Sequence, residues 1–230
     1  IKYYDDQNME MESLNEILGY LPQYPSFYKN FSVYEMLLYI ATLKGLKKNI
    51  IKERISEVLH EVNLWDDKNM KIKALSGGMK QRLGIAQAII NHPRILIVDE
   101  PTAGLDPKER IRFRDVIKNI SLNTIVIFAT HIVSDVELIA TNIILLKSGK
   151  VILDEKRETV FQYIENKIWE IEDVKENTDE LLTKYPVLEA YWIEDKVHIK
   201  IISDEKPAAF AIQIKPRLED LYMYYFGDVQ

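Results

Sequence analysis

The 230-residue sequence contains no cysteine, which excludes disulfides, thiol catalysis and thiolate metal sites. Its four histidines, His60, His92, His131 and His198, are scattered and lack the spacing of a zinc site. No apolar run approaches the ~18 residues that a membrane-spanning helix needs. There is no basic tract and the formal net charge is −6, so composition does not favour nucleic acid as a partner. The sequence also lacks the G-x-x-x-x-G-K-S/T motif of a phosphate-binding loop.

Three short apolar runs predict strands that are buried on both faces. The runs are LGYL at 18–21, ILIV at 95–98 and TIVIFA at 124–129. Helical patterns separate them, which favours an α/β fold with a mostly parallel sheet. Gln23, Asp99, Glu100 and His131 follow these runs. Because ligands bind at the carboxyl ends of parallel strands, we expect these four side chains to converge on one site.

Capping patterns indicate where the helices begin. Ser32 and Glu35 form a capping box at the start of a predicted helix. Asp106–Pro107 starts another helix, and Glu109 is expected to complete a second capping box there. The helical stretches at about 33–44 and 50–62 indicate an inserted helical subdomain, to which we assign residues 26–88.

The pattern changes after a charged segment at 154–158, and this change divides the chain into two predicted domains. We expect an α/β core at 1–155, which ends in a hairpin at 144–155 that turns at Ser148–Gly149. We expect a small α+β appendix at 159–230. Its predicted elements are strands at 168–173, 187–193 and 197–202, a helix near 176–184 and a closing amphipathic helix at 215–226.

The segment LSGGMKQR at 75–82 has the features of an anion site. Ser76 is placed to cap a helix, and free backbone N–H groups and a partial charge of roughly +0.5 face outward at such an end. Gly77 and Gly78 remove side chains, so an anion can approach the backbone. Of the two acids Asp99 and Glu100, one can hold Mg²⁺ and the other can deprotonate a water. Each feature alone also suits an ordinary capped helix or a solvated strand end.

Taken together and in this order, the motifs resemble those of the ATP-binding subunit of an ABC transporter. LPQ at 21–23 resembles the Q-loop, LSGGMKQR the signature motif, and ILIVDE at 95–100 Walker B. AGLD at 103–106 is similar to the D-loop, and His131 to the switch histidine. The resemblance covers residues 1 to about 155 and implies a P-loop NTPase-like core. The appendix is more loosely similar to the tails of ATPases that pair with bacterial drug or peptide exporters.

The resemblance assigns a role to each matching residue. Gln23 would contact Mg²⁺ and the attacking water, Asp99 would hold Mg²⁺, Glu100 would be the general base and His131 would contact the γ-phosphate of ATP. Asp106 would bridge two ATPase domains in a homodimer or heterodimer. The residues that would serve the ATP held by the partner domain are Ser76, Gly77, Gly78 and Gln81. A transmembrane permease would be the further partner, with the chain on the cytoplasmic, inner face of the membrane.

One departure from the family is large, because Walker A and the adenine-stacking aromatic residue should lie ahead of Ile1. The chain begins without methionine on a strand-like IKYY segment, so we expect that it is an N-terminally truncated piece. In that case the chain alone would be inactive. We also expect the strand that leads into Walker A to lie beside the Walker B strand, so that its absence uncovers apolar faces.

Two other functions remain open from the sequence. An ATPase of DNA maintenance or translation shares the signature, but the short interval between Gln23 and Ser76, the absent cysteines and the acidic balance argue against it. A non-catalytic interaction module is the other alternative. Export rather than import is favoured only by the appendix, and the transported substrate is not indicated.

Overall fold

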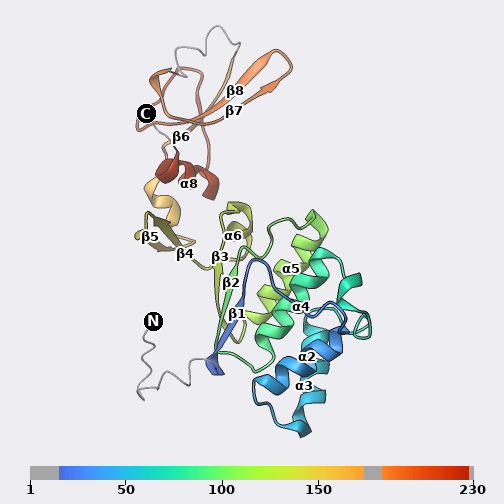
Figure 1. Ribbon diagram of the computed structural model, residues 1–230. Coiled ribbons are helices and arrows are strands. Elements are labelled where there is room, and N and C mark those ends of the chain that lie inside the picture. Colours follow the sequence, from blue (N-terminus) through green and yellow to red (C-terminus); the bar gives the residue numbers. More distant parts are fainter. Residues whose placement is uncertain (1–15, 174–182, 228–230) are drawn as a thin grey trace, which may run out of the picture. The chain divides into compact units, whose positions relative to one another are not determined.

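The computed structural model describes residues 16–173 and 183–227 (Figure 1). The chain divides into two compact units, Ile1–Ile132 and Val133–Gln230. The strand-like segment at 1–4 and most of the helix expected near 176–184 lie outside the described residues.

The first unit alternates strands with helices, as the sequence predicts. Its elements are β1 (Leu18–Leu21), α2 (Val33–Leu43), α3 (Lys48–Glu61), the short 3₁₀ helix η1 (Ile72–Ala74), α4 (Gly77–Ile89), β2 (Ile95–Asp99), α5 (Pro107–Ile120) and β3 (Ile125–Ala129). The three strands form one parallel sheet in the order β1-β2-β3. The α/β fold with a parallel sheet is thus confirmed.

The position of β2 corrects one expectation. Leu96 of β2 pairs with Gly19 of β1 on one side and with Val126 of β3 on the other. Since both edges of β2, the strand of the Walker B motif, are occupied, no further strand can lie beside it. The prediction that the strand leading into Walker A lies next to the Walker B strand is therefore wrong. A strand added to this sheet must pair with the outer edge of β1 or β3.

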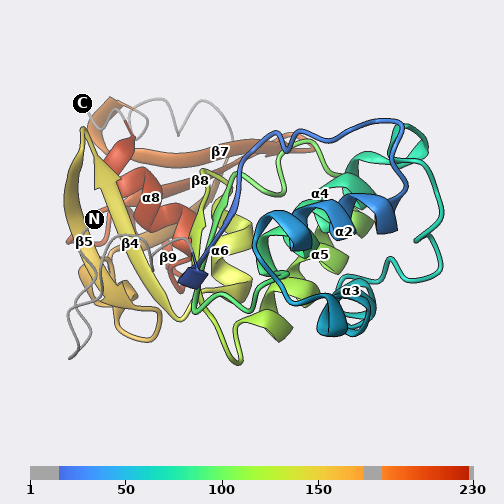
Figure 2. The ribbon, with the colours of Figure 1, turned by 60° about the horizontal axis from the view of Figure 1, so that its bottom comes forward.

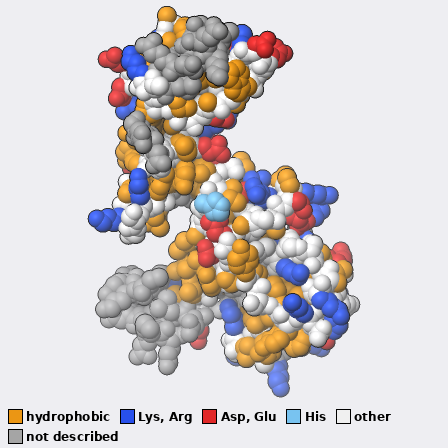
Figure 3. Space-filling view, turned by 45° about the horizontal axis from the view of Figure 1, so that its top comes forward, with side chains coloured by type: hydrophobic (Ala, Val, Ile, Leu, Met, Phe, Trp, Pro, Cys, Tyr) orange, Lys and Arg blue, Asp and Glu red, His pale blue; other side chains and the backbone are white. Residues whose placement is uncertain are grey.

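Helices cover one face of the sheet. Helices α4 and α5 lie against this face, and α2 and α3 lie beyond α4 (Figure 1 and Figure 2). Leu21, Leu96 and Val98 are buried beneath them, and Phe113 is the largest fully buried side chain. On the other face Tyr20, Ile125 and Ile127 are 52%, 62% and 51% exposed, and no element within residues 16–132 covers them. Hydrophobic side chains accordingly gather at the surface of this unit (Figure 3).

The inserted helices α2 and α3 pack together and onto α4. The Ser32–Glu35 capping box is confirmed, because the Glu35 N–H donates to Ser32 Oγ at 3.1 Å and the Ser32 N–H donates to Glu35 Oε2 at 2.6 Å. The buried Arg54 of α3 donates from Nε and Nη2 to the carbonyls of Ile90 and Ile89, at 3.0 and 2.7 Å. Arg54 therefore fastens α3 to the carboxyl end of α4.

The second unit has an α+β arrangement. Its elements are α6 (Val133–Ile139), β4 (Asn142–Lys147), β5 (Lys150–Lys156), the 3₁₀ helix η2 (Val160–Tyr163), β6 (Ile168–Asp173), β7 (Val187–Ile193), β8 (Lys196–Ile202), β9 (Ile212–Gln213) and α8 (Leu218–Phe226). The expected hairpin is present as β4 and β5, and Ser148 and Gly149 at its turn have φ of 50° and 76°. Strands β6 to β9 form an antiparallel sheet in the order β7-β8-β6-β9.

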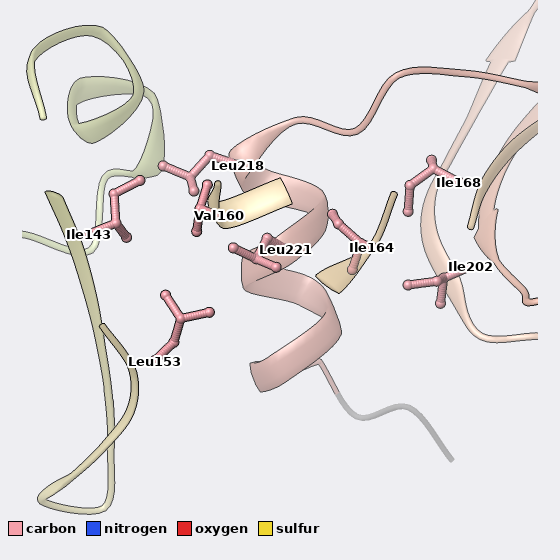
Figure 4. Close-up of a cluster of buried hydrophobic side chains, with 8 residues drawn as sticks. All are labelled: Ile143, Leu153, Val160, Ile164, Ile168, Ile202, Leu218 and Leu221. Carbon is pink, nitrogen blue, oxygen red and sulfur yellow. The ribbon is translucent and has the colours of Figure 1, made fainter. Parts of the chain in front are cut away.

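Helix α8 holds the second unit together. Figure 4 shows Leu218 and Leu221 of α8 beside Val160 and between the hairpin residues Ile143 and Leu153 and the sheet residues Ile168 and Ile202. In the structure the hairpin therefore packs with the C-terminal unit. The functional boundary at 155–159 stays a prediction, because packing within this chain does not determine which residues act as the ATPase core.

Candidate functional site

The polar residues that follow the three strands lie at one edge of the sheet. The register pairs Leu21 with Val98 and Val98 with Phe128, so the three carboxyl ends lie level with one another. Asp99 is the last residue of β2 and Gln23 comes two residues after β1. Both side chains are partly exposed. The predicted convergence of the loops that carry these residues on one edge agrees with this register.

Glu100 is the best-defined acid at this edge. Its N–H donates to the Ala129 carbonyl of β3 at 2.9 Å, and its φ of 45° lies in the left-handed region. A non-glycine residue in this region costs roughly 1–3 kcal/mol and marks a position that the surrounding contacts determine. The backbone turn carries the Glu100 side chain towards the residues that follow β3.

Three donors hold the Glu100 carboxylate. The backbone N–H of His131 donates to Oε1 at 2.9 Å, and His131 Nδ1 lies 2.8 Å from the same oxygen. Thr130 Oγ1 donates to Oε2 at 3.1 Å and itself accepts from the Ile132 N–H at 3.0 Å. The structure thus brings together Glu100 and His131, both predicted, and adds Thr130. Sequence reasoning did not select Thr130, although its place between β3 and His131 was a signal that could have found it.

The imidazole of His131 is open to solvent, whereas the Glu100 carboxylate is sheltered. The His131 side chain is 70% exposed and that of Glu100 is 19% exposed. An exposed imidazole leaves Nε2 accessible to a ligand that approaches this edge, while Nδ1 stays next to Glu100. The pair therefore has an accessible imidazole and a carboxylate that His131 and Thr130 hold in place.

Gln23 and Gln81 meet at the amino end of α4. Gln81 is only 8% exposed, and its Nε2 donates to the Gln23 backbone carbonyl at 3.1 Å. In this structure Gln81 therefore joins the signature helix to the loop after β1. That Gln81 contacts the ATP of a partner domain stays a prediction. Within this chain its side chain has a structural role, the hydrogen bond to the loop after β1.

The signature segment forms the amino terminus of a 13-residue helix, as expected. Ser76 is the N-cap of α4, and its hydroxyl accepts from the Met79 N–H at 3.2 Å. Ser76 and Gly77 are exposed, but Gly78 is buried. A side chain at Gly77 would meet no other atom of the chain within 4 Å, whereas one at Gly78 would collide with Glu109. The two glycines therefore have different surroundings.

Asp106 caps α5 as predicted, but Glu109 does not complete a capping box. The Glu109 N–H donates to Asp106 Oδ1 at 2.9 Å. The Glu109 carboxylate instead lies 3.4 Å from Arg82 Nε and 2.5 Å from Arg112 Nη1. A buried guanidinium attracts the acid more strongly than an exposed backbone N–H does, which explains the difference. The role of Asp106 at a domain interface stays a prediction.

The donors at the sheet edge fit a magnesium ion bound together with a nucleotide. Asp99 offers carboxylate oxygens and Gln23 an amide oxygen, which are ligands that Mg²⁺ prefers. No group of three or more His, Asp or Glu side chains suited to a metal is found among residues 16–173 and 183–227. Mg²⁺ at nucleotide sites needs only one or two carboxylates, because water and phosphate supply the remaining ligands.

Comparison with known proteins identifies relatives of the chain. Residues 2–103 match the family described as ABC transporter. The uncharacterized ABC transporter ATP-binding protein YxlF of Bacillus subtilis is 31% identical over 198 residues, which cover 86% of this chain and 63% of that protein. YdbJ of the same organism, with the same description, is 38% identical over 165 residues, or 71% of this chain and 53% of that protein.

A solved structure of an ABC transporter component also matches the chain. The structure of cbiO1 from Clostridium perfringens, described as part of the ABC transporter complex cbiONQ, matches with a TM-score of 0.60 and 31% identity. The match covers 66% of this chain and 61% of cbiO1. Residues 2–103 thus carry a domain of the ABC transporter family, and the chain is related to ATP-binding proteins of ABC transporters. It spans between about half and two thirds of the length of these relatives.

Proposed function

We propose that the chain is part of an ATP-binding and ATP-hydrolysing subunit that drives a membrane transporter. The observation that carries the proposal is the arrangement at the sheet edge, where Thr130 and His131 hold the Glu100 carboxylate beside Asp99. The family relationship supplies the class of reaction. In the part of the chain that the structure describes, no helix is both long enough and apolar enough to span a membrane. A separate permease would supply the membrane path; cbiO1 is likewise described as part of an ABC transporter complex.

Each residue has a task in the proposed hydrolysis. Glu100 Oε1 already accepts twice from His131, so Oε2 has the lone pair that can take a proton from the attacking water. His131 would contact the γ-phosphate through its exposed edge. Asp99 and Gln23 would hold Mg²⁺, which when bound neutralises the negative charge that develops on the phosphates.

The signature segment would act on a second domain. The exposed N–H groups at the start of α4, beside Ser76 and Gly77, are suited to a phosphate presented by another molecule. We therefore propose a head-to-tail dimer in which this helix closes over the ATP held by the partner domain. Dimers of identical or of different ATPase domains both fit this arrangement.

The test requires a version that also carries a phosphate-binding loop ahead of Ile1, called the extended protein below. Glu100→Gln keeps the size and hydrogen bonding of the side chain but removes the proton acceptor, so hydrolysis should fall ~10²–10⁴-fold. ATP binding should persist, and an ATP-loaded dimer should accumulate in size-exclusion chromatography. Asp99→Asn should weaken nucleotide binding itself, and no dimer should form. Ser76→Arg should bind ATP normally and fail to dimerise.

A near-parent rate of phosphate release by Glu100→Gln would contradict the assignment of the base. A Glu100→Gln variant that binds ATP and stays monomeric would contradict the dimer mechanism. For the direction of transport we propose export of a drug- or peptide-type substrate, supported only by the resemblance of the C-terminal unit. Transport measured in vesicles of both orientations, with the permease present, tests that finer proposal.

A further inference from the structure

Gly78 of the signature segment is packed against an acid of its own chain. A Cβ atom at Gly78 would lie 2.7 Å from Glu109 Cγ and 2.8 Å from Cδ, and still closer to Oε2. Contacts under 3.0 Å require one of the two groups to move. At Gly77 the corresponding space is empty. In this structure a side chain at Gly78 therefore requires the end of the Glu109 side chain to shift, before any nucleotide is considered.

Moving the Glu109 side chain away from Gly78 would disturb its two ion pairs. The contact with Arg82 is an ion pair without a hydrogen bond between Nε and Oε2. Its side chain is 13% exposed, and its carboxylate is paired with Arg82 at 3.4 Å and with Arg112 at 2.5 Å. Its backbone N–H is fixed by Asp106. Displacing the carboxylate would leave the guanidinium of Arg82, which is 7% exposed, without its counter-charge.

Arg82 extends the connection into the inserted helices. Its Nη1 donates to the carbonyls of Val62 and Asn63, which follow α3, at 3.1 and 2.7 Å. The Arg82–Glu109 pair thus joins three parts of the first unit: the end of α3, the signature helix α4 and the start of α5.

We propose that Glu109 is a positioning residue, which holds the outward-facing start of α4 in place through Gly78 and Arg82. This inference rests on the proposed function, because the start of α4 is the part that would meet the ATP of the partner domain. It divides the work of the two glycines: Gly77 leaves the outer surface open to phosphate, and Gly78 leaves room for Glu109.

A double-mutant cycle in the extended protein tests this division. Gly78→Ala should lower the thermal unfolding midpoint by about 3–8 °C, as expected for overpacking in a protein of this size. It should also reduce ATP-dependent dimerisation, measured in the Glu100→Gln background, by tenfold or more. Adding Gly78→Ala to Glu109→Ala should cause little further loss in either measurement, because the colliding side chain is gone.

Gly77→Ala is the matched control. It should leave the unfolding midpoint within about 2 °C of the parent. Its effect on dimerisation should be the same with Glu109 and with Ala at that position. If Glu109→Ala does not fold, Glu109→Asp replaces it, since Asp keeps the charge for Arg82 and withdraws the carboxylate by one methylene. Gly78→Ala should then cost less in the Asp background than with Glu109.

Two outcomes would overturn the proposal. If Gly78→Ala lowers the unfolding midpoint and dimerisation equally with Glu109 and with Ala at position 109, the effect of the new side chain does not depend on contact with Glu109. A Gly78→Ala variant with an unchanged unfolding midpoint would show that Glu109 is free to move. A Glu100→Gln protein with Gly78 and Glu109 intact that binds ATP without dimerising would instead overturn the proposed dimer. The unfolding midpoints would still report whether the Glu109 contact exists.

Discussion

Thr130 offers a test of how the catalytic carboxylate is oriented. Thr130→Val replaces the hydroxyl by a methyl group of similar size, so packing is largely retained. The change removes the 3.1 Å hydrogen bond to Glu100 Oε2 and the acceptor of the Ile132 N–H. Thr130→Ser, which keeps the hydroxyl, is the matched control.

The expected effect follows from the bond that is lost. A hydrogen bond to a charged group contributes about 1.5–3 kcal/mol, and each 1.36 kcal/mol corresponds to a tenfold change in rate. If the bond orients Oε2 towards the attacking water, kcat of the extended protein should fall about 10–100-fold. KM for ATP should change by less than about threefold, because removing a group that acts only in the transition state does not weaken ground-state binding.

Steady-state phosphate release over a range of ATP concentrations checks this prediction, alongside thermal unfolding to confirm that each variant is folded. Combining Thr130→Val with Glu100→Gln should add little to the loss caused by Glu100→Gln, because both changes act on the same step. A kcat of Thr130→Val within twofold of the parent would refute the orienting role. So would a Thr130→Ser variant as slow as Thr130→Val.

Four further outcomes are expected. In urea unfolding, Arg54→Met should destabilise the extended protein by about 2–5 kcal/mol more than Lys52→Met, because two buried carbonyls lose their donor. Lys52 lies on the exposed side of the same helix and is the control. Equal losses would contradict this prediction. The 230-residue chain alone should show no micromolar binding of MgATP by calorimetry, because it offers no cradle for the α- and β-phosphates. The same chain should self-associate in analytical ultracentrifugation through its exposed sheet face, less so after Ile127→Thr, and a monomer at all concentrations would oppose this. The hydrogen bond from the Ser32 backbone N–H helps to lower the pKa of Glu35 from 4.5 to about 2. The stabilisation from this carboxylate is therefore complete above about pH 4.5 and is lost as the pH falls towards 2. Glu35→Gln should make the unfolding midpoint depend less on pH over that range.

The strands and the edge they share could be predicted from the sequence because these features depend on local patterns. Short β-branched runs separated by helical periodicity leave few alternatives to a parallel sheet, and parallel strands bring their carboxyl ends together. The position of Gln23, Asp99, Glu100 and His131 at this edge follows from these patterns, and their roles stay predictions. The order of the strands is different in kind. The central position of β2 depends on which strands pair with each other, and no residue pattern within β2 predicts that pairing.

The contacts of single side chains could not be predicted, because they are decided by partners that are distant in sequence. The spacing of Asp106 and Glu109 predicts a capping box, yet Arg82 of another helix takes the carboxylate. Thr130 was overlooked because its value comes from the left-handed turn at Glu100, which directs the acid towards it. Unlike glycine, glutamate does not indicate a positive φ, so the turn at Glu100 could not be predicted from the sequence.

The same reasoning explains why the signature helix is fastened so closely to the rest of its unit. Gln81 and Arg82 are neighbours on α4, but they reach in different directions. Gln81 bonds to the loop of Gln23 after β1, and Arg82 pairs with Glu109 at the start of the helix that follows the acidic pair. A movement of α4 relative to the sheet must therefore stretch both contacts at once. These two contacts connect the start of α4 with the loop after β1 and with the first turn of α5, the two segments that flank the loop of Glu100 in the sequence order of the motifs.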